Sequence, residues 1–250
     1  MNPAVHVEAT KLARSLVGRL GSAILVGGLA AICLGLLAAI RSGDPQLTAK
    51  LGPSATFDWA GLTSSAAQVT SAGGLLGFGV VLAWIFAREF ADGTITGLFG
   101  LPVGRGQIAA AKLVVYAGWS TVVSLACAAA VTVIGLGFGL GLPDASAWAA
   151  LGRQVVLGIL TAALALPVAW ASTAGRSLLA GVTTAVGLVI VAQVGVLAGA
   201  GGWMPLAAPA LWAIGAGPAI TTEQLGMSLA LGVAFAAVTV ASWHRLQLDR

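Results

Sequence analysis

The residues best suited to chemistry lie between positions 88 and 112. Of the 12 Lys and Arg and 8 Asp and Glu in the chain, five fall in this segment: Arg88, Glu89, Asp92, Arg105 and Lys112. Between them lie Ile95, Leu98, Phe99 and Leu101, followed by Pro102, which ends a helix. This pattern predicts a short helix that presents apolar side chains beside charges, a surface suited to docking on another protein. The alternative is an interfacial elbow that only connects two membrane helices, with its basic residues at the lipid headgroups.

Patterns for catalysis, metal binding and nucleotide binding are weak elsewhere in the chain. His6 and His244 stand apart from any cysteine or carboxylate group at ligand spacing. Cys33 and Cys127 lie inside apolar segments, where a thiol packs as a small apolar group. No lysine follows the glycine pattern of a P-loop, so any ATP must bind to another chain. We therefore assign no catalytic, cofactor-binding or metal-binding residue.

The elements that must position the 88–112 loop are membrane helices. The chain is 58% hydrophobic and 8% charged, with a mean hydropathy of +0.99, which excludes an ordinary soluble domain. Its uncharged runs reach the roughly 20 residues that a helix needs to cross a bilayer, and they lack the alternation of β-barrel strands. The sequence predicts an all-α integral membrane protein with one transmembrane domain. Its six spans are expected near 21–40, 62–87, 113–140, 152–172, 177–199 and 225–243.

The uncharged run from 177 to 222 is too long for one helix, so a seventh span is the alternative. Its second part, residues 200–223, contains Pro205, Pro209 and Pro218. A stretch so short and interrupted does not cross a membrane alone. We expect it to form a re-entrant or interfacial segment before the last span.

The charges also predict the orientation in the membrane. Nine cations fall on the side of both termini: Lys11, Arg14, Arg19, Arg88, Arg105, Lys112, Arg176, Arg245 and Arg250; Arg41, Lys50 and Arg153 fall on the other. The positive-inside rule then places both termini and the 88–112 loop in the cytoplasm of a plasma-membrane protein. Tryptophans at the headgroup level are expected to mark the outer face (Trp59, Trp148, Trp203 and Trp212) and the inner face (Trp84, Trp170 and Trp243). The net charge of +4 does not indicate nucleic-acid binding, because the cations form no continuous stripe.

Residues 1–20 form the pattern of an amphipathic helix. Apolar residues recur at spacings of three and four: Ala9, Leu12, Ala13, Leu16, Val17 and Leu20. Glu8, Lys11 and Arg14 fall on the remaining face. We expect a helix that lies in the cytoplasmic interface and contacts membrane lipid. The alternative is a solvated basic leader that only orients the first span.

The segment from Arg88 to Lys112 resembles the loop of ABC transporter permeases of the type-2 export class. Their pattern is approximately Arg-Glu, two or three residues, Gly-Thr, an apolar stretch, Pro, a small residue or two, Arg and a following Lys. Those places are filled here by Arg88, Glu89, Gly93, Thr94, Leu98, Leu101, Pro102, Arg105 and Lys112. The amphipathic N-terminal helix, six spans, cytoplasmic termini and proline-broken outer segment are also similar to that family.

The resemblance implies that the loop contains a coupling helix, which docks on a separate ATPase subunit. The docking residues it indicates are Arg88, Glu89, Phe90, Asp92, Gly93, Thr94, Leu98, Phe99, Pro102 and Arg105. It also implies two ATPase copies that bind ATP and Mg, and a second permease chain, identical or related. In similar proteins the second and fifth spans line the substrate path, which here indicates Gln68, Thr70 and Gln193. For each of these three residues, a hydrogen bond between helices is the alternative role.

Two other classes of function remain open from the residues alone. An ion-coupled secondary transporter or channel is also a bundle of apolar helices, but it usually carries ionisable residues within its spans. Here only Arg153, at an outer boundary, comes close to that description. A membrane enzyme or signalling partner would need a nucleophile, a base or a metal group that the sequence does not offer.

Overall fold

The computed structural model describes residues 3–44, 56–100, 102–215 and 219–247, and every regular element in these ranges is a helix. Within them, six segments are long and apolar enough to cross a membrane. They are Leu16–Ser42 (α2), Trp59–Ala91, Arg105–Gly137 (α7), Ala145–Ala174, Leu178–Leu197 (α10) and Thr222–Arg245 (α12). The predicted all-α fold with six long apolar helices is confirmed, and the chain is a multi-pass membrane protein.

Two of these six segments are interrupted, whereas single helices were expected at 62–87 and 152–172. Their parts are α4 (Trp59–Val69), the π-helical turn η1 (Thr70–Gly74) and α5 (Leu75–Ala91) in the second segment, and α8 (Ala145–Leu164) and α9 (Pro167–Ala174) in the fourth. The fourth breaks because Pro167 has no N–H to donate and its ring clashes with the preceding turn. In the second, the π turn is a local insertion of the kind that often accompanies functional sites.

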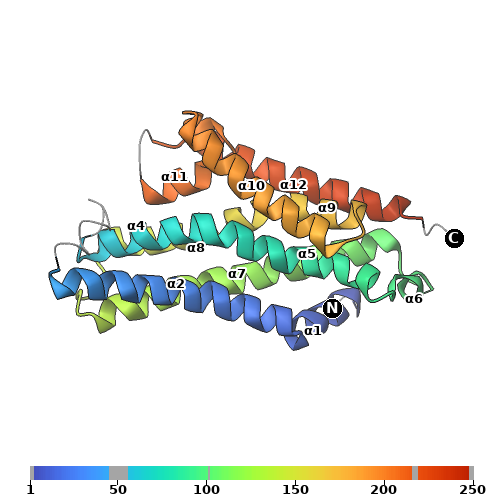
Figure 1. Ribbon diagram of the computed structural model, residues 1–250, viewed down its shortest axis with the longest axis horizontal. Coiled ribbons are helices and arrows are strands. Elements are labelled where there is room, and N and C mark those ends of the chain that lie inside the picture. Colours follow the sequence, from blue (N-terminus) through green and yellow to red (C-terminus); the bar gives the residue numbers. More distant parts are fainter. Residues whose placement is uncertain (1–2, 45–55, 101, 216–218, 248–250) are drawn as a thin grey trace.

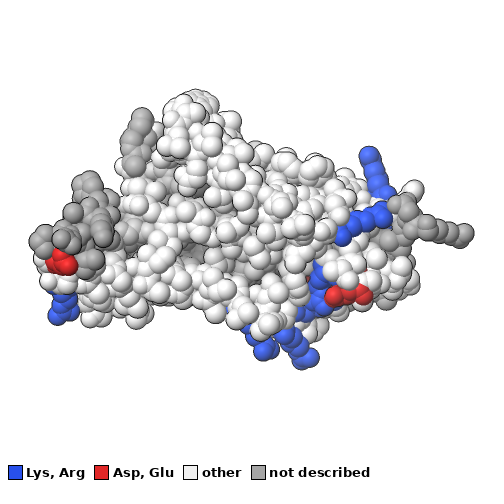
Figure 2. Space-filling view, in the orientation of Figure 1, with Lys and Arg blue, Asp and Glu red and all other residues white. Residues whose placement is uncertain are grey.

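The long helices form a layered bundle in which α5 and α8 are central. Figure 1 shows α2 and α7 on one side of this pair and α10 and α12 on the other. The short helix α6 (Ile95–Phe99) and both ends of the chain lie toward the same end of the bundle. In the view of Figure 2, charged side chains lie at the left end and from near the middle of the lower edge to the right end, and an uncharged band separates the two groups. Such a band is the arrangement that a bilayer requires, because charge at its centre is costly.

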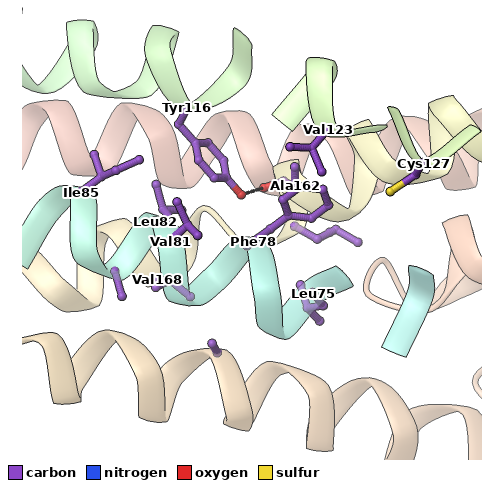
Figure 3. Packing of buried hydrophobic residues seen from close by; sticks show 14 of the residues in the cluster. Leu75, Phe78, Val81, Leu82, Ile85, Tyr116, Val123, Cys127, Ala162 and Val168 are labelled. Carbon is purple, nitrogen blue, oxygen red and sulfur yellow. Dashed lines mark hydrogen bonds between the residues drawn. The ribbon is translucent and has the colours of Figure 1, made fainter. Parts of the chain in front are cut away.

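The core is built around α5, which is buried on most of its circumference. Leu75, Phe78, Leu82 and Ile85 of this helix pack against residues of α7, α8 and α9 (Figure 3). The hydroxyl of Tyr116 on α7 donates a hydrogen bond to the carbonyl of Ala162 on α8, at 3.0 Å. Because Tyr116 is only 2% exposed, this bond keeps its polar tip satisfied within apolar surroundings.

The segment before the last long helix contains two short helices, η2 (Gly201–Trp203) and α11 (Ala208–Ile214). Neither is long enough to cross a membrane. The segment is held to the bundle by contacts of α11 with α4 and α8, and by Ser228 of α12, whose hydroxyl donates to the carbonyl of Pro205 at 2.7 Å. Pro218, one of the prolines that predicted the interruption, lies outside the described residues.

The N-terminal helix is shorter than predicted. Helix α1 spans Pro3–Arg14, and α2 begins at Leu16, so the expected single helix over residues 1–20 is wrong. The break is at Ser15, which has an extended backbone and whose hydroxyl accepts a hydrogen bond from the N–H of Gly18. This is an N-cap, and it starts a new helix because it satisfies one of the unpaired amides of the first turn. Helix α1 packs against α7 rather than continuing α2.

Candidate functional site

The predicted docking loop begins where α5 ends, at Ala91, and reaches the start of α7 at Arg105. Gly93 has a φ of 67°, a left-handed conformation that glycine adopts without steric cost, and it turns the chain away from α5. Five residues then form α6, and Pro102 follows. The structure therefore contains a short helix where the spacing predicted one, although it is little more than one turn long.

The loop residues divide into exposed and inward-facing groups. Asp92, Gly93, Thr94 and Pro102 are exposed, while Arg88, Phe90, Leu98 and Arg105 are half-buried. Ile95, which was expected on the outward apolar surface, is 6% exposed and packs against the core. The side chain of Phe99 and the whole of Leu101 lie outside the described residues. Among the predicted docking residues that the structure describes, those most available to a partner are therefore the turn 92–94, part of Leu98, and Pro102.

Glu89 differs from the other predicted docking residues because it faces the interior. It is 2% exposed, and its Oε1 accepts hydrogen bonds from Lys112 Nζ at 2.7 Å and from Lys11 Nζ at 3.2 Å. Glu8 completes the group: its Oε2 lies 2.9 Å from Lys112 Nζ and its Oε1 lies 2.6 Å from Lys11 Nζ. We call these four residues the ionic cluster. The described pairs of Glu89 are all internal, whereas the resemblance indicated it as a docking residue.

The ionic cluster joins three helices at the base of the loop. Glu8 and Lys11 come from α1, Glu89 from the last turn of α5, and Lys112 from the second turn of α7. Two lysines and two glutamates balance in charge, which removes most of the penalty for placing ions away from water. One position is incomplete, because Oε2 of Glu89 is buried without a hydrogen-bond partner.

The pKa shifts of the α1 members have the signs expected for paired ions. Burial alone would raise the pKa of Glu8, but the charges and hydrogen bonds of Lys112 and Lys11 outweigh it and hold this pKa below its usual value. Burial alone would lower the pKa of Lys11, yet the neighbouring carboxylates of Glu8 and Glu89 raise it overall. Both groups are therefore charged at neutral pH, and the ion pair between Glu8 and Lys11 is fully formed there.

Lys112 is the centre of the cluster. It is completely buried, and its three N–H donors have three acceptors: Glu8, Glu89 and the carbonyl of Ile85, which lies 3.0 Å from Nζ. The ring of Trp243 on α12 lies 6.0 Å from Nζ. Trp243, which was expected to mark the inner face, is 0% exposed and lies inside the helix bundle.

Trp243 also connects the cluster to the end of α12. Its Nε1 donates to Thr173 Oγ1 of α9 at 3.0 Å, and its ring packs edge-on against Phe86 and Phe90. Phe90, one of the predicted docking residues, is therefore also an internal contact. Burial of this indole is stable because its apolar ring fills the core while its N–H has a hydrogen-bond partner.

The two arginines of the loop are held by nearby groups. The guanidinium of Arg88 lies 4.6 Å from the centroid of Trp84, and its Nε is 3.9 Å from Oδ2 of Asp92. Arg105 donates to the carbonyl of Leu246, just after α12. These contacts fix both ends of the loop against the protein and leave the 92–104 segment between them.

The residues predicted to line a substrate path are not brought together. Gln68 on α4 and Gln193 on α10 are both exposed, on helices that diverge toward the end of the bundle opposite to α6 (Figure 1). Thr70, the first residue of the π turn, instead accepts a hydrogen bond at 2.6 Å from Nε2 of Gln154, on α8. For Thr70, the alternative role as a hydrogen bond between helices is therefore the one the structure contains.

Comparison with protein families decides the identity of the chain. A model described as "ABC-2 family transporter protein" matches residues 4–193, which include α1, the ionic cluster, the loop and most of α10. The chain belongs to the ABC-2 transporter family. A comparison with curated proteins gives no match. This ABC-2 protein is thus a membrane component of an ABC transporter, a class whose permeases generally pair with ABC ATPase subunits.

Sequence reasoning assigned no partner to three members of the ionic cluster of this ABC-2 protein: Glu8, Lys11 and Lys112. Each was visible as a charge on the N-terminal helix or at the start of an apolar run. Nothing in the sequence gives the packing of α1 against α7, which brings positions 8 and 112 together. Across the described parts of the chain, no three His, Cys, Asp or Glu side chains are grouped as they would be around a metal ion.

Proposed function

We propose that this ABC-2 chain is the permease half of an ATP-driven exporter. In this proposal, two permease chains, identical or related, form the substrate path across the plasma membrane. Two copies of a separate ATPase bind ATP and Mg and drive the change of access. The chain itself contributes binding and movement rather than catalysis, which agrees with its family and with the absence of a P-loop from its sequence.

The observation that carries the coupling part of the proposal is the ionic cluster at the base of the loop. Glu89 lies in the last turn of α5, just before the loop, and Lys112 lies seven residues into α7, after the loop; their charged atoms are 2.7 Å apart. A displacement of α6 by a bound ATPase would therefore act on both long helices and, through Glu8 and Lys11, on α1. Coupling requires such an element, whose arrangement both the ATPase and the transport path can bias.

The proposed docking surface is the outer part of the loop. Asp92, Gly93, Thr94 and Pro102 are exposed there, with Leu98 half-buried beside them. Phe99, Arg88 and Arg105 remain proposed members of this surface on the basis of the family pattern. Glu89 and Phe90 are reassigned to transmission, because their described contacts are internal.

The proposed orientation places α1, the loop and both termini in the cytoplasm and η2 and α11 on the outer side. The cation asymmetry of the sequence supports it, as does the common position of both chain ends with α6 in the bundle (Figure 1). This is the side on which an ATPase finds ATP. Gln68 and Gln193, exposed toward the opposite end, remain proposed contacts of the substrate or of the second permease chain.

Co-purification of the ATPase with an affinity-tagged chain tests the proposal. Leu98→Asp places a charge on the proposed docking surface, and we expect it to weaken ATPase association about fivefold to thirtyfold, the cost of losing one significant interface contact. Leu142→Asp is the matched control, because Leu142 is 88% exposed in the turn between α7 and α8, at the other end of the bundle. The control should be recovered with its ATPase as efficiently as the wild type.

Two results would overturn this assignment. Equal ATPase recovery with Leu98→Asp and Leu142→Asp would remove the loop from the interface. Cargo transport at full rate by purified chain in vesicles with an ion gradient and no ATPase would favour an ion-coupled secondary transporter. The buried charges do not themselves favour that alternative, because they lie within α1, at the end of α5 and near the start of α7, and are mutually paired.

A further inference from the structure

A basic pocket lies at the corner where α1 meets α2. It has a volume of about 740 Å³ and is formed by α1, the first residues of α2 and the last turns of α5. Three cations line it: Lys11 and Arg14 of α1, and Arg88 of α5. Of the described residues that line the pocket, none is acidic. A hollow with cations on two helices and no carboxylate facing it favours an anionic ligand.

The three cations carry hydrogen-bond donors that the protein leaves unused. Arg14 is exposed, and its guanidinium forms no hydrogen bond or ion pair with any described residue. Arg88 lies 3.9 Å from Oδ2 of Asp92, which is too long for a hydrogen bond. Lys11 has three N–H donors, of which the two carboxylates of the ionic cluster accept two. A phosphate group offers several anionic oxygens and is a good acceptor for donors of this kind.

The surroundings of the pocket indicate that its anion belongs to a lipid. Val7 and Leu16 also line it and are 50% and 70% exposed, so apolar surface lies directly beside the cations. Trp84 lines the same pocket, and tryptophan favours the headgroup level of a bilayer. In Figure 2, blue side chains project from the lower edge beside the uncharged band, where Figure 1 has α1 and the start of α2. The pocket therefore lies at the border between apolar and charged surface, where lipid phosphates are found.

We infer that this pocket binds the phosphate of an anionic phospholipid. The phosphate lies among Lys11, Arg14 and Arg88, and the acyl chains lie against the exposed side chains of Leu16 and Leu20 on α2. A zwitterionic lipid is disfavoured, because no acidic residue among the described lining pairs with its ammonium group. Basic pockets between helices at a membrane surface are suited to anionic headgroups. The bound lipid joins the corner between α1 and α2 to the end of α5. This site goes beyond the proposed function, because it requires neither the ATPase nor ATP.

Native mass spectrometry of the purified full-length chain in detergent micelles tests the site. The chain is stripped of lipid and titrated with phosphatidylglycerol or with phosphatidylcholine of the same acyl chains, and the bound copies are counted from the mass. We expect phosphatidylglycerol to bind roughly tenfold more tightly. Arg14→Gln should weaken its binding about fivefold, the effect of one basic residue at an anionic headgroup, and should leave phosphatidylcholine binding unchanged. Folding should persist, because the side chain of Arg14 has no described partner.

Arg19→Gln is the matched control. Arg19 is an exposed cation near the start of α2 that does not line the pocket, so its loss removes the same charge and should leave binding unchanged within about twofold. Phosphatidylglycerol binding by Arg14→Gln that is no weaker than binding by Arg19→Gln would overturn the site. Equal affinity of the wild-type chain for the two lipids would overturn recognition of an anionic headgroup.

A competition experiment separates a lipid from a free anion. Glycerophosphoglycerol has the phosphate and headgroup of phosphatidylglycerol but no acyl chains. At equal concentration it should displace little of the bound lipid, because it lacks the apolar contacts with Leu16 and Leu20. Displacement of most of the phosphatidylglycerol would show that the pocket takes any soluble phosphate, and would overturn the lipid as its ligand.

Discussion

Lys112→Met would remove a fully buried cation and leave the carboxylates of Glu8 and Glu89 with Lys11 as their remaining described lysine partner. Methionine keeps most of the side-chain length and volume, so the change is mainly one of charge. Breaking a buried ion pair by removing one partner typically costs 3 to 5 kcal/mol. We expect about 3 kcal/mol here, at the lower end of that range, because the side chain of Lys11 is 27% exposed and admits some water to the group.

Lys11→Met, in the same cluster, is the matched variant for Lys112→Met. The Nζ of Lys11 lies 3.2 Å from Oε1 of Glu89, whereas the Nζ of Lys112 lies 2.7 Å from it, and Lys11 is partly hydrated. We therefore expect Lys11→Met to lower the free energy of unfolding by about 1 kcal/mol. The two losses correspond to factors of roughly 150 and 5 in the unfolding equilibrium. The double variant Lys112→Met with Glu89→Gln should lose less unfolding free energy than the sum of the two single variants, because Glu89→Gln removes one of the carboxylates that Lys112→Met leaves without its lysine.

The assay is unfolding of the purified chain in mixed micelles by titration with sodium dodecyl sulfate, followed by tryptophan fluorescence. Trp243 lies 6.0 Å from Lys112 Nζ and is one reporter of the loss of local packing. Equal shifts for Lys112→Met and Lys11→Met, together with additive behaviour of the double variant, would refute the reasoning. The four residues would then not act as one energetic unit, and the proposed transmission through them would lose its support.

Three further predictions concern pH, packing and orientation. Because the folded pKa of Glu8 lies below its ordinary value of 4.5, its stabilising contribution is complete above that value and is lost as pH falls through the lower folded pKa. The protection factors of the α1 amides, which correct the exchange rates for the intrinsic effect of pH, should therefore be unchanged from pH 8 to 6 and should fall below pH 4.5. Gly181→Val should cost about 1 to 3 kcal/mol in the same unfolding assay, since its Cβ would lie 2.6 Å from Cβ of Ala83, whereas Gly187→Val on the same helix has open space and should be nearly neutral. In intact cells, an impermeant thiol reagent should modify a cysteine placed at Leu142 and spare one placed at Gly104; the reverse pattern would invert the proposed orientation.

The six long helices could be predicted because the length of an apolar run is a property of the sequence alone. An uncharged stretch of 20 residues has few stable forms other than a spanning helix once lipid is the solvent. The interruptions were harder to predict. Pro167 was present as a signal for a break, but the π turn at Thr70–Gly74 depends on how α4 and α5 pack against α8.

The candidate site could be predicted only in outline. The apolar residues around Leu98, followed by Pro102, predicted a short helix, and the structure contains α6 there. The direction in which Glu89 points could not be read, because it depends on a lysine 23 residues later and on a helix near the N-terminus. A charge beside a predicted loop is usually solvated, and only tertiary packing shows that this one is buried.

Burial of Glu89 changes how the loop can act. If its carboxylate contacted the ATPase directly, the ATPase could displace the loop while residues 92–104 changed conformation, and the long helices would not move. Instead, the ion pair from Glu89 to Lys112 closes the base of the loop, and the contact from Arg105 to the Leu246 carbonyl ties the same base to the end of α12. In the proposed coupling, a force on α6 would then act on α5, α7 and α12 together. Neutral substitutions in the ionic cluster should therefore uncouple ATP hydrolysis from transport while ATPase binding persists, whereas Leu98→Asp should reduce binding itself. A cluster variant that loses ATPase binding as severely as Leu98→Asp would place Glu89 back in the interface and contradict this division of roles.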